Sequence, residues 1–209
     1  MKKMRIAVLL VAAVLMCLLL CGAALADDTQ QKKIVYVVLD DSTSMTTNQR
    51  NRWSHANYAT QVLAGLMNEG DELRVYLLRQ GFQDFDLTAR GIQNSLNELS
   101  RKNTVGNTPF ETVEKAQRTL SARTPEENAQ YWLVVLTDGV YNEGYDAEKL
   151  RSIFTSYVDK GIGLSHYPMQ VIYCTIGNKN DSVTLIAQTQ NEIDALLEKG
   201  IYCYHAEDD

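Results

Sequence analysis

Two uninterrupted apolar runs constrain the fold of this chain more than any other feature. They are "KIVYVVLD" at Lys33–Asp40 and "YWLVVLTD" at Tyr131–Asp138. A strand that faces solvent on one side alternates apolar and polar residues, whereas these runs do not, which is typical of strands covered on both faces. Further strands are predicted at Glu72–Gln80, Met169–Gly177 and Ile201–Glu207.

Helical spacing of apolar residues separates these strands. The predicted helices are Ser54–Asn68, Ile92–Leu99, Phe110–Leu120, Ala147–Val158, and one or two segments within Val183–Lys199. Strands alternating with helices indicate a doubly wound α/β domain, a mostly parallel sheet with helices on both faces. A short strand at Asp84–Ala89 follows Gly81 closely, and we expect a hairpin that adds one antiparallel strand at an edge.

The first 26 residues form a separate segment. "MKKMR" is basic, Ile6–Leu20 is apolar, and Ala24–Ala26 supplies small residues at a cleavage position. This pattern predicts a signal peptide over 1–26, with export to the cell envelope or the medium. An uncleaved membrane anchor stays open as an alternative, because Ile6–Ala26 is uncharged and long enough to span a bilayer.

The remaining chain has the composition of one globular domain, which we place at 33–209 after a lead-in at 27–32. The whole chain carries a formal charge of −6. Removal of the signal peptide takes away three basic residues and no acid, which leaves 183 residues and a charge of −9. This balance excludes nucleic acid as a partner and gives the mature domain no attraction to anionic lipid.

Oxygen-bearing side chains gather where the predicted strands end. Asp40, Ser42 and Ser44 follow the first buried strand, Thr108 precedes a helix, and Asp138 ends the second buried strand. Carboxylate and hydroxyl oxygens without histidine or cysteine are the ligands of Mg²⁺, Mn²⁺ or Ca²⁺. Each residue also has a simpler interpretation, since the serines and the threonine could cap helices and an aspartate before glycine could make a turn.

The set resembles the metal-ion-dependent adhesion site of von Willebrand factor type A (vWA) domains, and the resemblance extends from Ile34 to the C-terminus. That site is written DxSxS, followed by a distant threonine and a distant aspartate. The resemblance implies that Ser42, Ser44 and Thr108 ligate the metal directly or in a switched state, and that the aspartates often act through water. It also implies that a partner protein's glutamate or aspartate completes the coordination. Thr43 departs from the family's usual glycine, and we expect Asp41 to face solvent.

The leading prediction is therefore an exported, non-enzymatic domain that binds an acidic residue of a partner protein through a divalent cation, most readily Mg²⁺. A metal-dependent phosphohydrolase of similar topology is the alternative. It is weakened because haloacid-dehalogenase-type phosphatases need a second carboxylate at the position of Ser42, and a hydroxyl cannot do that proton transfer at neutral pH. An interaction domain with a purely structural metal is a third possibility.

Two further expectations concern the end of the chain. Domains of this family usually finish with a helix after the last strand, so we expect either a segment of a longer protein or a sheet with one partly uncovered face. Cys174 and Cys203 fall on the last two predicted strands. A disulfide between them requires a suitable register, and separate thiols are the expected outcome.

Overall fold

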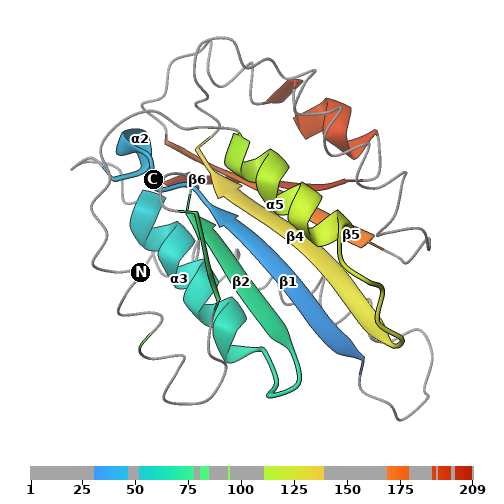
Figure 1. Ribbon diagram of the computed structural model, residues 1–209. Coiled ribbons are helices and arrows are strands. Elements are labelled where there is room, and N and C mark those ends of the chain that lie inside the picture. Colours follow the sequence, from blue (N-terminus) through green and yellow to red (C-terminus); the bar gives the residue numbers. More distant parts are fainter. Residues whose placement is uncertain are drawn as a thin grey trace.

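The computed structural model describes residues 31–46, 52–77, 81–84, 94, 111–138, 169–178, 190–191, 193–198 and 201–208. A six-stranded sheet runs in the order β3-β2-β1-β4-β5-β6 (Figure 1). Its strands are β1 (Lys32–Leu39), β2 (Glu72–Leu77), β3 (Gly81–Asp84), β4 (Ala129–Thr137), β5 (Met169–Asn178) and β6 (Tyr202–Asp208). All neighbouring pairs are parallel except β2 and β3, which pair antiparallel at one edge. The predicted doubly wound α/β fold is confirmed.

The edge strand begins earlier in the chain than the sequence predicted. We expected it at Asp84–Ala89 after a hairpin loop, but β3 (Gly81–Asp84) already begins at Gly81, and residues 85–89 lie outside the described residues. Its antiparallel register sets Phe82 opposite Tyr76 of β2. The prediction reserved these residues for the loop and so placed the strand too late.

The sheet separates two apolar cores. Alternate residues of β1 point to opposite faces, because successive side chains of a strand alternate. Val35, Val37 and Leu39 share one core with helix α3 (Arg52–Gly65). The intervening residues Ile34, Tyr36 and Val38 share the other core with helix α5 (Glu111–Ser121). Figure 1 shows α5 lying across β1 and β4.

Several predicted helices fall wholly or partly outside the described residues. These are Ile92–Leu99, where only residue 94 is described, and Ala147–Val158. Within Val183–Lys199, residues 193–197 are helical, and Leu196 packs into the same core as α5. In the part of the chain that the structure describes, no helix has the length and apolar character needed to cross a membrane.

Paired charges fix the amino ends of the strands. The carboxylate of Asp71 accepts the backbone N–H groups of Lys33 at 2.7 Å and Asn68 at 2.8 Å, and it pairs with the Lys33 ammonium at 2.9 Å. These contacts join the turn before β2 to the start of β1. The same end of the sheet carries a second network around an arginine.

That second network centres on Arg123, beyond the end of α5. Its guanidinium donates to Glu72 at 2.6 Å, to Glu126 at 2.8 Å and to the hydroxyl of Tyr36 at 3.1 Å. Glu126 also accepts from Lys32 at 2.7 Å. Each acid of this network therefore has a basic partner, which ties the starts of β1, β2 and β4 together.

The register of the last two strands explains why the cysteines do not pair. Cys203 lies opposite Tyr173, and Cys174 lies opposite Tyr204. An offset of one residue sends the two side chains to opposite faces of the sheet. Cys174 accordingly belongs to the α3 core, while Cys203 packs against the α5 core. Separate thiols were expected, and no disulfide joins these two described residues. Burial raises the pKa of the Cys174 thiol to about 12, which makes it unreactive.

Candidate functional site

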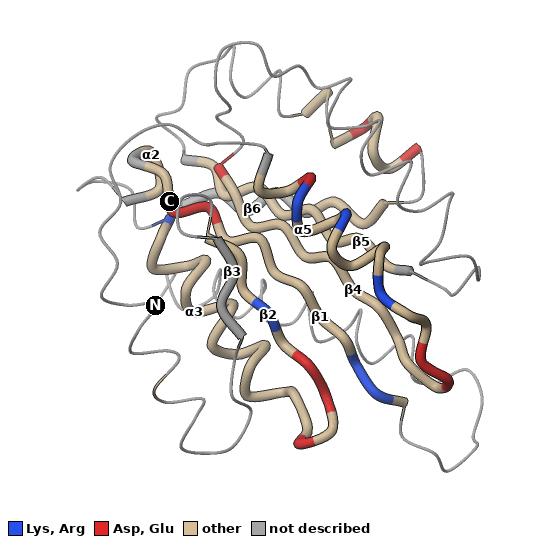
Figure 2. The backbone as a smooth tube through the Cα atoms, in the orientation of Figure 1, with Lys and Arg blue, Asp and Glu red and all other residues tan. Residues whose placement is uncertain are grey.

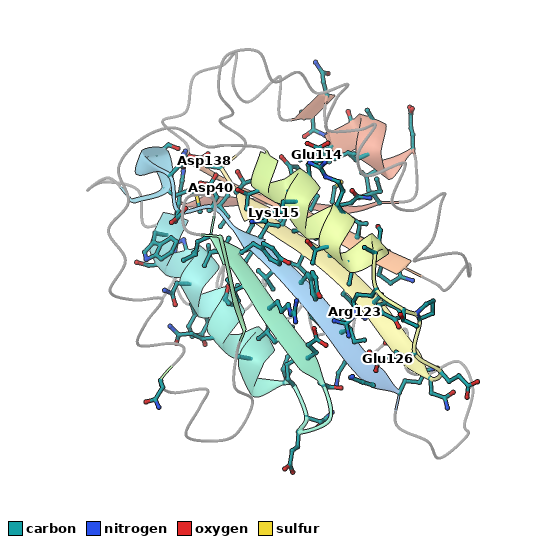
Figure 3. All side chains as sticks on the ribbon, viewed as in Figure 1. Asp40, Glu114, Lys115, Arg123, Glu126 and Asp138 are labelled. Carbon is teal, nitrogen blue, oxygen red and sulfur yellow. The ribbon has the colours of Figure 1, made fainter. Side chains whose placement is uncertain are left out.

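Two aspartates meet at the carboxyl ends of β1 and β4. These strands are parallel neighbours with Leu39 opposite Leu136, so Asp40 and Asp138 leave the sheet at the same edge. Figure 3 shows the two side chains close together there. Strand order runs outward in opposite directions from β1 and β4. Open α/β sheets bind their ligands at such a switch point, beyond the carboxyl ends of the strands.

Asp40 is almost completely buried, and each of its carboxylate oxygens accepts a hydrogen bond. Its Oδ1 accepts the N–H of Ser42 at 2.9 Å, and its Oδ2 accepts the hydroxyl of Thr137 at 2.6 Å. Burial and then the negative charge of Asp138 raise its pKa to about 6, against the opposing effect of these hydrogen bonds. Burial and the neighbouring carboxylate thus favour the protonated form of Asp40, whereas a cation beside it would favour the ionised form.

The segment after Asp40 is folded rather than loose. A short helix, α2 (Thr43–Thr46), begins here, and the N–H of Met45 donates to the carbonyl of Ser42 at 3.2 Å. Met45 is fully buried in the core beneath α3. This apolar anchor holds the two serines, whose Oγ atoms lie 3.0 Å apart.

Asp138 forms a buried ion pair that the sequence did not predict. The Nη1 of Arg52, the first residue of α3, donates to Asp138 Oδ2 at 2.9 Å. Neither side chain has any exposed surface. Thus the second carboxylate of the site faces a guanidinium from the first residue of α3.

One expectation about this segment is wrong. Asp41 was expected to face solvent, but it has 0% exposure. It directly precedes the turn into α2. Among the described residues, Asn128 is the sole non-glycine residue with a positive φ, so the backbone of Thr43 is not in the left-handed region. Thr108 lies outside the described residues, so its predicted role stays a prediction.

The described oxygens suit a hard divalent cation. Ligands to Mg²⁺ lie about 2.0–2.1 Å from the ion in octahedral geometry, which puts adjacent ligands about 3 Å apart. The Ser42 and Ser44 hydroxyls have that separation at 3.0 Å. Carboxylate oxygens accept more than one contact each, so the bonds to Asp40 leave it able to face an ion as well. The described residues contain no group of three or more His, Cys, Asp or Glu side chains placed for a metal, so such a site depends on its hydroxyls.

Sequence reasoning missed two partners of the aspartates. Thr137 was assigned only to its strand, although its hydroxyl holds Asp40. Arg52 lay just outside the predicted helix at Ser54–Asn68. A signal for it existed, because a cation at a helix N-terminus opposes the helix dipole and needs another reason to be there.

Comparisons with known proteins identify the fold. No protein-family model matches the chain, and no curated protein matches it either. Among solved structures, a von Willebrand factor type A protein from Catenulispora acidiphila has a TM-score of 0.52 at 16% identity, over 87% of this chain and 39% of that one.

Two other solved structures show the same likeness. The conserved hypothetical protein BatB from Bacteroides thetaiotaomicron has a TM-score of 0.55 at 14% identity, over 85% of this chain and 91% of that one. The pilus adhesin SpaC from Lactobacillus rhamnosus GG has a TM-score of 0.58 at 14% identity, over 88% of this chain and 29% of that one. At such identities the likeness concerns the fold alone, and the fold is vWA-like.

Proposed function

We propose that this domain binds an acidic residue of a partner protein through a divalent cation held by Asp40, Ser42, Ser44, Thr108 and Asp138. One observation carries the proposal. The carboxylates of Asp40 and Asp138 share one buried edge of the sheet with two serine hydroxyls 3.0 Å apart. Mg²⁺ is the favoured ion, with Mn²⁺ and Ca²⁺ as alternatives.

The charges of the site support a cation there. Asp40, Asp41 and Asp138 are all buried, and among the described residues Arg52 is the basic residue that pairs with them at this edge. Counted over the described residues, these three carboxylates against one guanidinium carry a formal charge of −2 when all are ionised. A bound divalent ion would balance this charge, and its remaining positive field would attract a carboxylate from outside.

The proposed function is binding without catalysis. One of the solved structures with this fold, SpaC, is a pilus adhesin. This supports a binding role for the present domain, and we propose that its partner is a protein. Hydrolysis of a generic phosphate ester with Mg²⁺, lost on Asp40→Asn, would instead favour the phosphohydrolase alternative. No turnover is expected.

The first test measures metal binding. Mg²⁺ or Mn²⁺ should raise the melting temperature of the purified domain, because a ligand that binds only the folded state stabilises it by mass action. The double variant Ser42→Ala and Ser44→Ala should lose this rise while staying folded, since neither hydroxyl contributes to the apolar core. Ser121→Ala, on α5 outside the site, removes a hydroxyl and should keep the full response. Absence of any shift with Mg²⁺, Mn²⁺ or Ca²⁺ would refute the proposal.

The second test identifies the partner. A pull-down from the cell envelope of the source organism should recover a protein with Mg²⁺ present and lose it with EDTA. Replacing the partner's contacting glutamate or aspartate by its amide should abolish binding, because an amide lacks the charge that balances the ion. Recovery that EDTA does not change would contradict a metal-bridged contact.

We also propose that the protein is exported and cleaved after Ala26. The mature protein isolated from cells should then begin at Asp27 in an N-terminal mass measurement. A chain that keeps residues 1–26 in the membrane fraction would favour the anchor instead.

A further inference from the structure

The ion pair between Arg52 and Asp138 lies in the protein interior, where desolvation of a charge costs the most free energy. Both side chains are fully buried, and burying charges costs free energy even when they are paired. Arg52 is also the first residue of α3, a helix whose first turn contains no acidic residue. A cation at that end opposes the helix dipole. The position of Arg52 at the start of α3 is therefore unfavourable for the helix itself.

The contact of Arg52 with Asp138 at the candidate site suggests a role for this arginine. The guanidinium donates to Asp138 Oδ2 at 2.9 Å, and Asp138 is close enough to Asp40 for its charge to act on that carboxyl. A cation held between Asp40, Ser42 and Ser44 would be attracted by Asp138 and repelled by Arg52. The arginine and the metal are thus alternatives for the same negative charge.

We propose that Arg52 determines the affinity of this site for its metal, by neutralising Asp138 in the metal-free protein and so weakening divalent-cation binding. The inference rests on the proposed function and deepens it. Arg52 is a positioning residue in this scheme, because it acts on the metal through Asp138. It keeps the metal-free domain folded, and it makes filling of the site depend on the concentration of the cation.

The test compares metal affinity in matched variants. Arg52→Gln keeps an N–H donor for Asp138 but removes the charge, and Arg52→Lys keeps the charge. Arg74→Gln is the control, because Arg74 lies 5.5 Å from the ring of Tyr36, and its partner Glu72 belongs to the opposite end of the sheet. Mg²⁺ affinity is measured by calorimetric titration and by the metal-induced rise in melting temperature.

Arg52→Gln should bind Mg²⁺ roughly tenfold more tightly than the unchanged protein, within the usual range of coupling between sites. Its melting temperature should be lower without metal and should rise more steeply with it. Arg52→Lys and Arg74→Gln should keep the original affinity. Equal or weaker binding by Arg52→Gln, beside clear binding by the unchanged protein, would overturn this inference alone. No binding by any variant would overturn the proposed function, and this inference with it.

A measurement on the unchanged protein covers the case in which Arg52→Gln does not fold. The Nε–Hε NMR signal of Arg52, assigned from its own backbone, should shift when Mg²⁺ saturates the site. The corresponding signal of Arg74 should stay in place. An Arg52 signal that does not move at saturating Mg²⁺ would overturn the inference.

Discussion

The two ends of the sheet treat buried acids in opposite ways. At the amino end, burial opposes ionisation of Asp71, but the N–H groups of Asn68 and Lys33 and the Lys33 ammonium outweigh it and lower its pKa. At the carboxyl end, burial and the charge of Asp138 raise the pKa of Asp40 to about 6. Figure 3 shows Asp40 and Asp138 at one end of the sheet, with Arg123 and Glu126 at the other.

The difference separates charges that are paired within the fold from charges that the proposed function assigns to a ligand. At the amino end, Asp71, Glu72 and Glu126 each contact a lysine or arginine, and Figure 2 shows acidic and basic segments close together there. Their charges are balanced within the fold. At the carboxyl end, the described residues place three buried aspartates near one arginine, and burying a charge is costly where it is not compensated.

The largest effect is expected from breaking the ion pair at the carboxyl end. Asp138→Ala removes the carboxylate that Arg52 contacts, and breaking a fully buried pair costs about 3–5 kcal/mol of unfolding free energy. Urea denaturation measures this loss. The double variant Arg52→Met and Asp138→Ala, which removes both charges, should recover most of it. A loss well under 1 kcal/mol in the single variant would mean that solvent reaches the pair.

A smaller effect, with a defined sign, is expected from pH. Folding raises the pKa of Asp40 from 3.8 to about 6, so the folded protein binds this proton more tightly. Without metal, the contribution of Asp40 to stability should therefore fall as the pH rises from about 4 to above 6, by up to about 3 kcal/mol. The unfolding free energies of the original chain and Asp40→Asn, both in EDTA, should diverge over that window.

The amino end should show the opposite sign. The pKa of Asp71 is lowered in the folded state, so its contribution is present above the unfolded pKa and is lost as the pH falls through the folded value. The comparison is between the original chain and Asp71→Asn over the acidic range. Matching pH dependence for Asp40 and Asp71 would remove the distinction between the two ends.

The sequence predicted the fold well because the signal for a buried strand is local. The β1 and β4 runs contain no polar interruption, and their predicted bounds differ from the observed ones by one or two residues at each end. The start of the edge strand was misplaced, because whether Gly81 or Asp84 begins it depends on pairing with β2 and not on local composition. The apolar residues of a strand predict burial on both faces, but they do not predict the register in which the strand pairs with its neighbour.

Only the part of the site that follows from the order of the strands could be predicted from the sequence. Asp40 and Asp138 could be brought together, because the carboxyl ends of parallel strands share an edge. The burial of Asp41 could not be predicted, because it depends on the turn into α2 that buries Met45. The contact of Arg52 with Asp138 joins residues 86 positions apart, and it depends on where α3 begins relative to β4.

The smallest effect is expected at the amino end, from the ion pair between Lys32 and Glu126. The Nζ of Lys32 lies 2.7 Å from the Oε2 of Glu126, but about a third of each side chain is exposed. Exposed pairs contribute about 0–1 kcal/mol, because water and salt screen the attraction and two flexible side chains must be ordered. Lys32→Met should therefore lower the unfolding free energy by less than about 1 kcal/mol in urea denaturation, and added salt should shrink the difference.

Lys32→Met should also leave the response to Mg²⁺ unchanged, because the affected charge lies at the opposite end of β1 from Asp40. A Mg²⁺ response altered by Lys32→Met would show that the two ends are coupled through the sheet, contrary to their separate roles in folding and binding.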